Sequence, residues 1–588
     1  MTEGTEPALA RRERLVIVLL ALLQGLALYV VEYADAHNWA LLSGLAGQVP
    51  WYTLVLTVPT LMQLSLQRLD DRLFWTNTAL TLALFGSVAA WATWRVTAAP
   101  GTTAASILGP FAVSVAIVAF VGLPYLQVRL SQRRFSAPYP ELFAHAWQNA
   151  LTLAVAGIMV AIVWLLLLLW QELFKLIGID FFARLFGEDA FIYLVNGLLF
   201  GLGVLVARTQ HRAMQIGRQV VLAVFTGFLP LASFIALIFL ISLPFTGFAP
   251  LQRAASTAFT VSALVAALIL LLNAVVQTGR DCPYPRPLRW LIDCVVVALP
   301  ILAGIAIYAV IVRISAEGWT TDRFWALLAV GLLGAYAIGY ALAIFRRTGS
   351  WMAGVPRVNV VVSVVLIALG VLANSPLLDP TRIAVGSQLA RIEAVASDGT
   401  VDDATRSRIE YLRFDSGRSG AQAMQQLHDL SDSSPTFVTV LAEIAARPAR
   451  YAWQVDALDD QSPDELARRI AMAPDQAPLP AALIAALANG EVGGRSPCTE
   501  FDGSCVAQWL DVDLDQQADV VLCAISDAGI QCTIYVEANA QWRKLGSVTT
   551  GPTDTATRDA VRQGLIRIVP RQVQDLQFGD SEPVAIER

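Results

Sequence analysis

The chain has 588 residues, of which 56% are hydrophobic and only 15% are charged, and its mean hydropathy is +0.57. These values exclude an ordinary soluble globule, in which about 25% of residues are charged. The net charge of −6 is unevenly distributed: residues 1–374 hold 23 Lys and Arg against 16 Asp and Glu, whereas residues 375–588 hold 18 against 31. Phosphate binding needs a basic surface, so we expect no nucleic-acid partner.

Apolar windows recur through the first 374 residues, with short polar breaks between them. About 20 apolar residues in a helix span a bilayer core, because a helix satisfies its own backbone groups. The pattern therefore predicts about eleven transmembrane helices. The expected spans are 15–33, 51–66, 73–94, 107–128, 151–170, 191–207, 220–243, 258–276, 290–312, 324–345 and 358–372. The second span is short and contains Pro59, which favours a kinked helix or a half-membrane segment.

The positive residues between the expected spans indicate the orientation. With the N-terminus inside, the inner segments hold 17 Lys and Arg and the outer segments hold 6. Cytoplasmic loops are enriched in these residues. We therefore expect a bacterial inner-membrane protein with a cytoplasmic N-terminus and a periplasmic C-terminal region. The first apolar segment is too long for a secretory signal, so we expect a retained membrane anchor.

We expect three parts along the chain. Residues 1–374 form the transmembrane domain, and residues 375–490 form a helical periplasmic part, since apolar residues recur there at helical spacing. Residues 491–588 form a small β-rich part, with strands expected in ADVVLCAIS, GIQCTIYVEA, QWRKLGSV and GLIRIV. The expected fold class is a polytopic α-helical membrane protein with a C-terminal α+β extramembrane domain.

Four of the six cysteines lie in the β-rich part, at Cys498, Cys505, Cys523 and Cys532. Disulfides persist in the periplasm, so an even number of exported cysteines favours two disulfides. Of the three possible pairings we favour one, because a tight turn at SDAG places Cys523 opposite Cys532. Cys498 and Cys505 then close the short TEFDGS loop. The intervening gaps of six, seventeen and eight residues do not match the close ligand pairs of a zinc site.

The run DVDLDQQAD places acidic residues at alternating positions, as in a calcium-binding loop. These residues are Asp511, Asp513, Asp515 and Asp519. However, Gln516 replaces the glycine of such a loop, and Leu522 stands at the position of its bidentate glutamate. A solvated acidic turn before a strand explains the run better. It is therefore a weak calcium candidate, and we expect no metal or other cofactor.

Some residues of the membrane domain are expected to join helices. Asn196 and Asn273 lie near the middle of their spans and are expected to form hydrogen bonds between helices. Gly197 and Gly201 share one helix face and permit close packing. The stretch 171–189, QELFKLIGIDFFARLFGED, is too polar to span the bilayer and too apolar for a free loop. An amphipathic helix in the outer interface fits both properties.

Three motifs resemble those of a known family. They are WLLLLLWQELFKLIGIDFFARLF, SQLARIEA and IEYLRFDSGRSGAQAMQQL. From about residue 139 to residue 430 the chain resembles the bacterial membrane family called domain of unknown function 4153. The resemblance implies a multi-pass inner-membrane protein with an extramembrane C-terminal region. It implies no catalytic residues, since no activity is established for the family.

Known catalytic motifs are missing from the sequence: it contains no GxSxG, Walker A, HExxH or dinucleotide-binding fingerprint. The histidines are scattered, at His37, His145, His211 and His428. We therefore expect a non-enzymatic envelope protein that contacts membrane lipid and whose periplasmic domain binds or senses a protein or small molecule. One alternative is a transporter of a small or lipidic solute, which the number of spans favours. Another is an enzyme acting on lipid-linked substrates.

Overall fold

The computed structural model divides the chain into two compact units, Met1–Ala446 and Arg447–Arg588. Among the described residues, the first unit holds the membrane helices and several shorter helical segments, and the second holds a β-sheet with short helices. The described residues are 9–97, 103–134, 137–246, 257–277, 282–345, 351–396, 401–430, 435–447, 450, 463–473, 476–488, 492, 498, 504–513, 516–526, 529–538, 541–550 and 555–568.

Within these residues, ten helices are long and apolar enough to cross a membrane. They are α1 (Arg11–Ala36), α3 (Arg72–Val96), α4 (Ala105–Gln132), α5 (Tyr139–Leu176), α7 (Asp189–Thr209), α8 (His211–Thr246), α10 (Thr257–Val276), α11 (Arg286–Glu317), α12 (Thr321–Phe345) and α13 (Val355–Ala373). The second expected span corresponds to α2 (Leu45–Ser65), which contains Pro50 and Pro59. Its 21 residues extend about 31 Å at 1.5 Å per residue, enough to span the bilayer. The chain is a polytopic membrane protein, as predicted.

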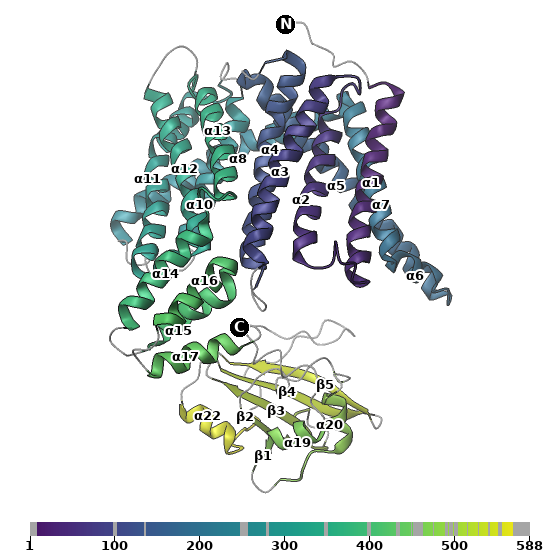
Figure 1. Cartoon of the computed structure of the whole chain (residues 1–588), viewed down its shortest axis with the longest axis vertical. Helices are drawn as coiled ribbons and strands as arrows, with labels where there is room; N and C mark the ends of the chain where they lie inside the picture. Colours follow the sequence, from purple (N-terminus) through teal and green to yellow (C-terminus); the bar gives the residue numbers. More distant parts are fainter. Residues whose placement is uncertain are drawn as a thin grey trace. The chain divides into compact units, whose positions relative to one another are not determined.

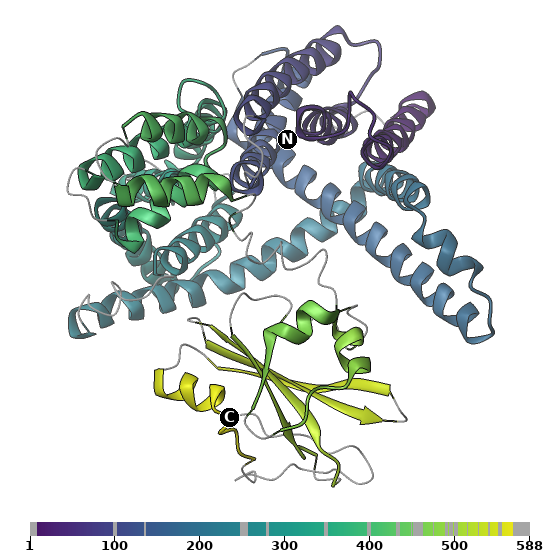
Figure 2. The ribbon, with the colours of Figure 1, turned by 60° about the horizontal axis from the view of Figure 1, so that its bottom comes forward.

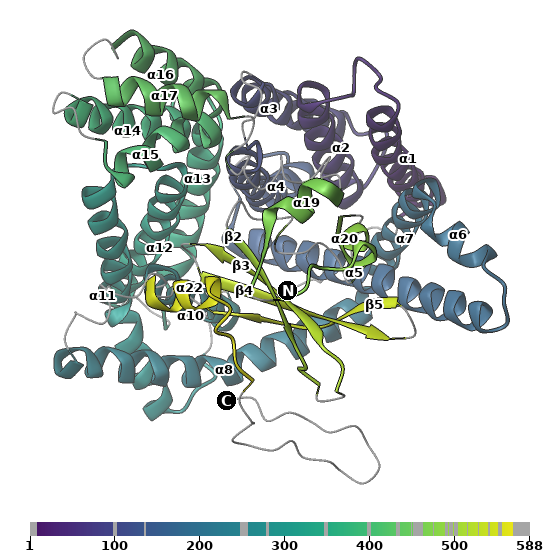
Figure 3. The ribbon, with the colours of Figure 1, turned by 90° about the horizontal axis from the view of Figure 1, so that it is seen from below.

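Most of the long helices run between two faces of the first unit (Figure 1), whereas α5 and α8 cross it obliquely and are seen side-on from below (Figure 3). We call the end where α1 begins the N-terminal face, and the end where α13 finishes the cap face. The expected interfacial helix at 171–189 does not form as one element. Its first residues continue α5, which is 38 residues long, and a seven-residue helix, α6 (Phe181–Gly187), follows a short turn. α5 is therefore well beyond the about 20 residues that a span requires.

The membrane helices form two lobes, each with its own hydrophobic core. The first lobe contains α1–α5 and α7, and its core includes Phe74, Phe111 and Leu123. The second contains α8 and α10–α13, and its core includes Leu268 and Leu299. Figures 2 and 3 show the lobes side by side. Since sequential helices pack mainly within one lobe, the chain completes the first lobe before the second begins.

Glycines bring α1 and α7 into close contact in the first lobe. A β-carbon at Gly197 would lie 2.5 Å from the carbonyl oxygen of Ala21, and one at Gly25 would lie 2.4 Å from that of Tyr193. Such distances leave no room for a side chain, so the two backbones touch directly. The predicted packing role of Gly197 is thus realised, and Gly25 provides its counterpart on α1.

Four helices and a π-helical turn follow α13 and form what we call the cap. They are α14 (Pro380–Ala396), α15 (Asp403–Glu410), the π-helical turn η1 (Tyr411–Asp415), α16 (Gly417–Leu430) and α17 (Pro435–Ala446). Ile392, Leu412 and Phe414 are fully buried in its core. Ser416 separates η1 from α16, directly before the GRSG stretch. The cap belongs to the same compact unit as the membrane helices.

The second unit is built on a five-stranded sheet. Its elements are α19 (Pro463–Arg469), β1 (Ile470–Met472), α20 (Ala481–Ala488), β2 (Ser504–Leu510), β3 (Asp519–Ser526), β4 (Gly529–Ala538), β5 (Gln541–Thr549) and α22 (Thr555–Arg562). The strand order is β1-β2-β3-β4-β5, with β1 parallel to β2 and the other pairs antiparallel. Because side chains alternate along a strand, β3 supplies Leu522 to one core and Val521 to another. Both faces of the sheet are therefore covered.

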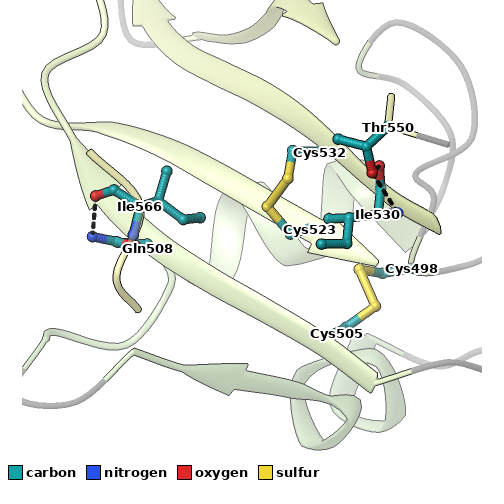
Figure 4. The surroundings of a disulfide bond; sticks show 8 residues. All are labelled: Cys498, Cys505, Gln508, Cys523, Ile530, Cys532, Thr550 and Ile566. Carbon is teal, nitrogen blue, oxygen red and sulfur yellow. Dashed lines mark hydrogen bonds between the residues drawn. A yellow bond between two sulfur atoms is a disulfide. The ribbon is translucent and has the colours of Figure 1, made fainter. Parts of the chain in front are cut away.

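Three of the four expected strands are present, as β3, β4 and β5. The fourth expectation is wrong: residues 564–568 follow α22 without forming a strand. Gln508 of β2 holds this segment instead, since its side chain donates to the carbonyl oxygen of Ile566 at 3.3 Å and accepts from the Ile566 amide at 3.4 Å (Figure 4). β1 and β2 were not expected.

Candidate functional site

A long apolar groove of about 530 Å³ lies between α2, α4 and α5 in the first lobe. The α2 wall extends from Leu45 to Leu64, the α4 wall from Leu108 to Leu123, and α5 contributes Leu153. At 1.5 Å per residue these walls are about 28 Å and 22 Å long, close to the ~30 Å thickness of a bilayer core. The groove therefore follows the helices through most of the membrane.

Pro59 explains why a polar residue of α1 lies beside the groove. A proline has no backbone N–H, so the carbonyl oxygen of Val55, four residues earlier, has no partner within the helix. The side-chain Nε2 of Gln24 donates to this oxygen at 3.0 Å and to Thr60 Oγ1 at 3.1 Å. Gln63 Nε2 in turn donates to Gln24 Oε1 at 2.9 Å. A side chain thus replaces the hydrogen bond that the α2 backbone cannot make.

The end of α2 on the N-terminal face is held in the same way. The last carbonyls of a helix lack partners within it. Arg208 donates to the carbonyl oxygens of Gln63 and Leu66, both at 2.7 Å. Gln127 donates to that of Leu64 at 3.0 Å and also pairs with Asn149. A cation at a helix C-terminus is further favoured by the helix dipole.

These groups border a small polar pocket of about 40 Å³ at the N-terminal face. His145 lines this pocket, together with Gln148 and Thr152 of the same helix. His145 therefore lies among polar side chains near the N-terminal face. His37, at the other end of the lobe, bonds through its ring Nδ1 to the carbonyl oxygen of Tyr33 at 2.8 Å. The two histidines lie on opposite faces of the bundle.

The polar side chains of the second lobe bond mainly to one another. The Tyr340 hydroxyl has one proton to donate and lies between two acceptors, Asn273 Oδ1 at 2.9 Å and Asn359 Oδ1 at 2.5 Å. Asn359 Nδ2 donates to the Tyr139 hydroxyl at 2.8 Å. These bonds join four helices, α10, α12, α13 and α5. In the first lobe, Asn196 Oδ1 accepts from Trp164 Nε1 at 2.7 Å. Both predicted asparagines therefore bond between helices.

The cap is bonded to both lobes through the YLRFDSGRSG motif and its neighbours. The Tyr411 hydroxyl accepts from the Thr321 amide, at the start of α12, at 3.0 Å. Burial raises the pKa of this hydroxyl. Arg418 donates to the carbonyl oxygen of Trp94, at the end of α3, and lies 4.8 Å from its ring centroid. Gly417 has a φ of +51°, and a β-carbon there would lie 2.4 Å from the Arg95 carbonyl oxygen. The motif therefore joins α3 to α12.

A buried ion pair strengthens the joint between the first lobe and the cap. Arg95 Nη1 lies 3.4 Å from Asp379 Oδ1, and the two side chains are 4% and 1% exposed. Asp379 Oδ1 also accepts from the Thr381 amide at 2.9 Å, at the start of α14. Arg95 Nε, Arg95 Nη2 and Asp379 Oδ2 are buried without a hydrogen-bond partner. A buried pair with such incomplete bonding depends strongly on both of its members.

The four cysteines of the second unit are paired as Cys498–Cys505 and Cys523–Cys532 (Figure 4). This agrees with the favoured pairing, since Cys523 stands directly opposite Cys532 in the β3–β4 register. One pair lies in each of the two cores of the sheet. Disulfides therefore brace both faces of the unit.

The acidic residues between β2 and β3 come together in part. Ligand oxygens of Asp511, Asp513 and Asp519 lie within 4.8 Å of one another, whereas Asp515 lies outside the described residues. Asp519 Oδ2 accepts from the Val512 amide at 2.9 Å, and Asp511 Oδ2 accepts from the Gln516 amide at 3.0 Å. These bonds suit a turn that its own carboxylates stabilise. Calcium binding stays a weak prediction.

Fold and bonding together define a multi-pass helical membrane protein with a helical cap and a disulfide-braced α+β unit. The family model described as "Domain of unknown function (DUF4153)" matches residues 52–427. The chain belongs to this family. The match begins earlier than the resemblance suggested, so it covers α2 from Tyr52 onward as well as the cap motif. No curated protein and no solved structure matches the chain.

Proposed function

We propose that the protein is a non-enzymatic envelope protein of the bacterial inner membrane, with a cytoplasmic N-terminus and a periplasmic region that binds or senses a partner. The observation that carries this proposal is the cap, which is hydrogen-bonded to α3 in the first lobe and to α12 in the second. A simple anchor requires no such joint. A cap that touches both lobes can relay a change between the membrane helices and the exported region.

The cysteines support the proposed orientation. Both disulfides lie in the second unit, whereas Cys282 and Cys294 of the membrane unit are free thiols. Cys282 precedes α11 and so lies toward the N-terminal face. Disulfides persist outside the cytoplasm and are rare inside it. The excess of arginines in the segments on the N-terminal face supports the same orientation.

Orientation is tested by labelling intact cells with a membrane-impermeant maleimide, with and without prior reduction. We expect the four cysteines of the second unit to be labelled in intact cells only after reduction. Cys282 serves as the internal control and should be labelled only after lysis. Labelling of the second unit that needs lysis but no reductant would place this unit in the cytoplasm and contradict the proposal.

The binding role is tested on β5, whose Leu545 and Val548 side chains are exposed. A photoactivatable amino acid at Val548 should give a discrete adduct in living cells. The same substitution at Val521, which is buried in the sheet, is the matched control and should give none. No adduct at Val548 would argue against β5 as the binding surface.

Transport of a small or lipidic solute is a second candidate, which the intramembrane groove favours. Transport requires access from both sides of the membrane. The groove wall ends near Leu61, Leu64 and Leu123, which are at most 6% exposed. Binding without release to the N-terminal face is therefore the simpler use of the groove. Flux of a labelled lipid across vesicles containing the protein would distinguish transport from binding.

A further inference from the structure

The groove between α2 and α4 lies within membrane-spanning helices, so its contents must be either water or hydrocarbon. Water occupies cavities that offer it two to four polar partners. Leucine, valine, phenylalanine and alanine side chains dominate the groove wall. Its volume of about 530 Å³ falls within the range typical of ligand-binding pockets. The groove is therefore suited to an apolar ligand.

The threonines in the wall do not change this conclusion. The Thr53 hydroxyl donates to the Val49 carbonyl oxygen at 2.7 Å, and the Thr57 hydroxyl donates to that of Thr53 at 2.6 Å. The hydroxyl oxygen of Thr60 accepts from Gln24 Nε2 at 3.1 Å. Each of these hydroxyls thus has a partner inside the protein. A ligand in the groove needs no hydrogen-bonding groups along its length.

The groove opens sideways and differs at its two ends. Leu56 of α2 is 50% exposed, and Ala112 and Ala116 of α4 are exposed along the opening. In a bilayer this opening faces lipid chains. Toward the N-terminal face the wall is closed by Leu64 and Leu123, which are 6% and 1% exposed. A chain that enters from the side therefore ends in a buried pocket.

The other end, toward the cap face, carries the polar groups. Gln48 and Tyr52 are half-buried there, and the Tyr52 hydroxyl donates to Glu32 Oε2 at 3.3 Å. Tyrosines are enriched where membrane helices meet the lipid headgroups. A molecule with a polar head and an apolar tail would place its head at this end. Its tail would then run along the helices to the closed end.

We propose that this groove binds one acyl chain of a membrane phospholipid from the leaflet on the cap face, with the end of the chain beside Leu64 and Leu123. The length of the groove, its apolar wall, its lateral opening and its single closed end all fit an acyl chain. This inference goes beyond the proposed function, because the groove would hold lipid whether or not the exported region binds a partner.

The experiment uses the full chain in vesicles of phosphatidylethanolamine and phosphatidylglycerol. The probe is a phosphatidylcholine that carries a diazirine near the end of one acyl chain. After illumination, the labelled residues are identified by mass spectrometry. We expect strong labelling of the buried closed end, which lipids on the outer surface of the protein cannot reach. Labelling confined to exposed positions such as Leu165 would overturn the proposal.

Two variants test whether the groove itself admits the chain. Ala116→Trp fills the opening and should lower labelling of the closed end several-fold. Ile117→Trp is the matched control, since Ile117 is the next residue of α4, is 44% exposed and does not line the groove. It should leave the labelling unchanged. Equal labelling of the closed end in both variants would overturn the proposal. If Ala116→Trp does not fold, Ala112→Trp fills the same opening and is measured in its place.

Discussion

The two lobes of the membrane bundle use polar side chains in different ways. In the first lobe, Gln24, Gln127 and Arg208 bond to backbone carbonyls of α2. In the second lobe, Tyr340 and Asn359 bond to each other and to further side chains. The first lobe contains the open groove, whereas Tyr340 of the second lobe is fully buried. Polar groups can therefore hold an interrupted helix beside an open groove or join helices in a closed core.

Proline accounts for much of this difference. α2 contains Pro50 and Pro59, and its backbone therefore needs donors from other helices. The second lobe also contains prolines, such as Pro300 in α11, but α11 is 32 residues long and packs into a continuous core. The contrast teaches that a helix interrupted by proline is stabilised by hydrogen bonds from neighbouring helices. Such a helix can border a ligand site without filling it.

The largest loss of stability is expected from a change at the contact between the first lobe and the cap. Asp379→Leu removes the partner of Arg95 and leaves a buried guanidinium without its counter-ion. Removing one member of a buried pair costs about 3–5 kcal/mol. Thermal unfolding in detergent, followed by tryptophan fluorescence, should show a marked loss of stability. The paired change Arg95→Met with Asp379→Leu removes both charges and should recover much of the loss. A double variant as unstable as Asp379→Leu would contradict this explanation.

The second-largest loss of stability is expected from a change that acts on the first lobe alone. Gly197→Leu places a side chain against the α1 backbone, where no space exists. Overpacking of this kind costs roughly 3 kcal/mol. The matched control is Gly304→Leu in α11, because a β-carbon there meets no atom within 4 Å. Thermal unfolding of both variants should show a large loss for Gly197→Leu and little change for Gly304→Leu. Equal losses would mean that the change of residue type matters more than its position.

The sequence predicts the features that depend on local pattern. The spans follow from apolar runs of fixed length, and the packing role of Gly197 follows from its spacing to Gly201. The position of Cys523 opposite Cys532 follows from the expected tight turn at SDAG, and the β3–β4 register agrees with it. The groove could not be predicted in this way. It depends on which faces of α2 and α4 pack together. Residue spacing along one sequence does not show which faces of two helices meet.

One hydrogen bond of the first lobe could have been anticipated from the sequence. Pro59 implies an unpaired carbonyl four residues earlier, at Val55, and hence a donor from another helix. The sequence does not say that the donor is Gln24, because Gln127 of α4 carries the same side-chain amide. The strand expected in 564–569 was wrong for a related reason. Its apolar residues fit a strand, but Gln508 of β2 bonds to Ile566 without strand pairing.

The third effect concerns the donor that Pro59 requires. Gln24→Leu leaves the Val55 carbonyl without its partner and also removes the acceptor of Gln63. A buried polar group that loses its partner costs about 1–3 kcal/mol. Thermal unfolding should therefore show a moderate loss. In the double variant with Pro59→Ala, a backbone N–H is again available to Val55, so the added cost of Gln24→Leu should shrink. An undiminished cost in that background would refute the proposed role of Gln24.

The smallest effect is expected in the second lobe, from Tyr340→Phe. The change removes one hydroxyl, but Asn273 Oδ1 keeps its bond from Asn359 Nδ2 at 2.6 Å. Hydrogen bonds between side chains of membrane helices are worth about 0.6 kcal/mol on average. Thermal unfolding should thus show a smaller loss than for Gln24→Leu. A side chain that bonds another side chain leaves partners that can rearrange, whereas the carbonyl of Val55 is fixed in its helix. The order of the two losses therefore tests the distinction between the lobes, and a larger loss for Tyr340→Phe would reverse it.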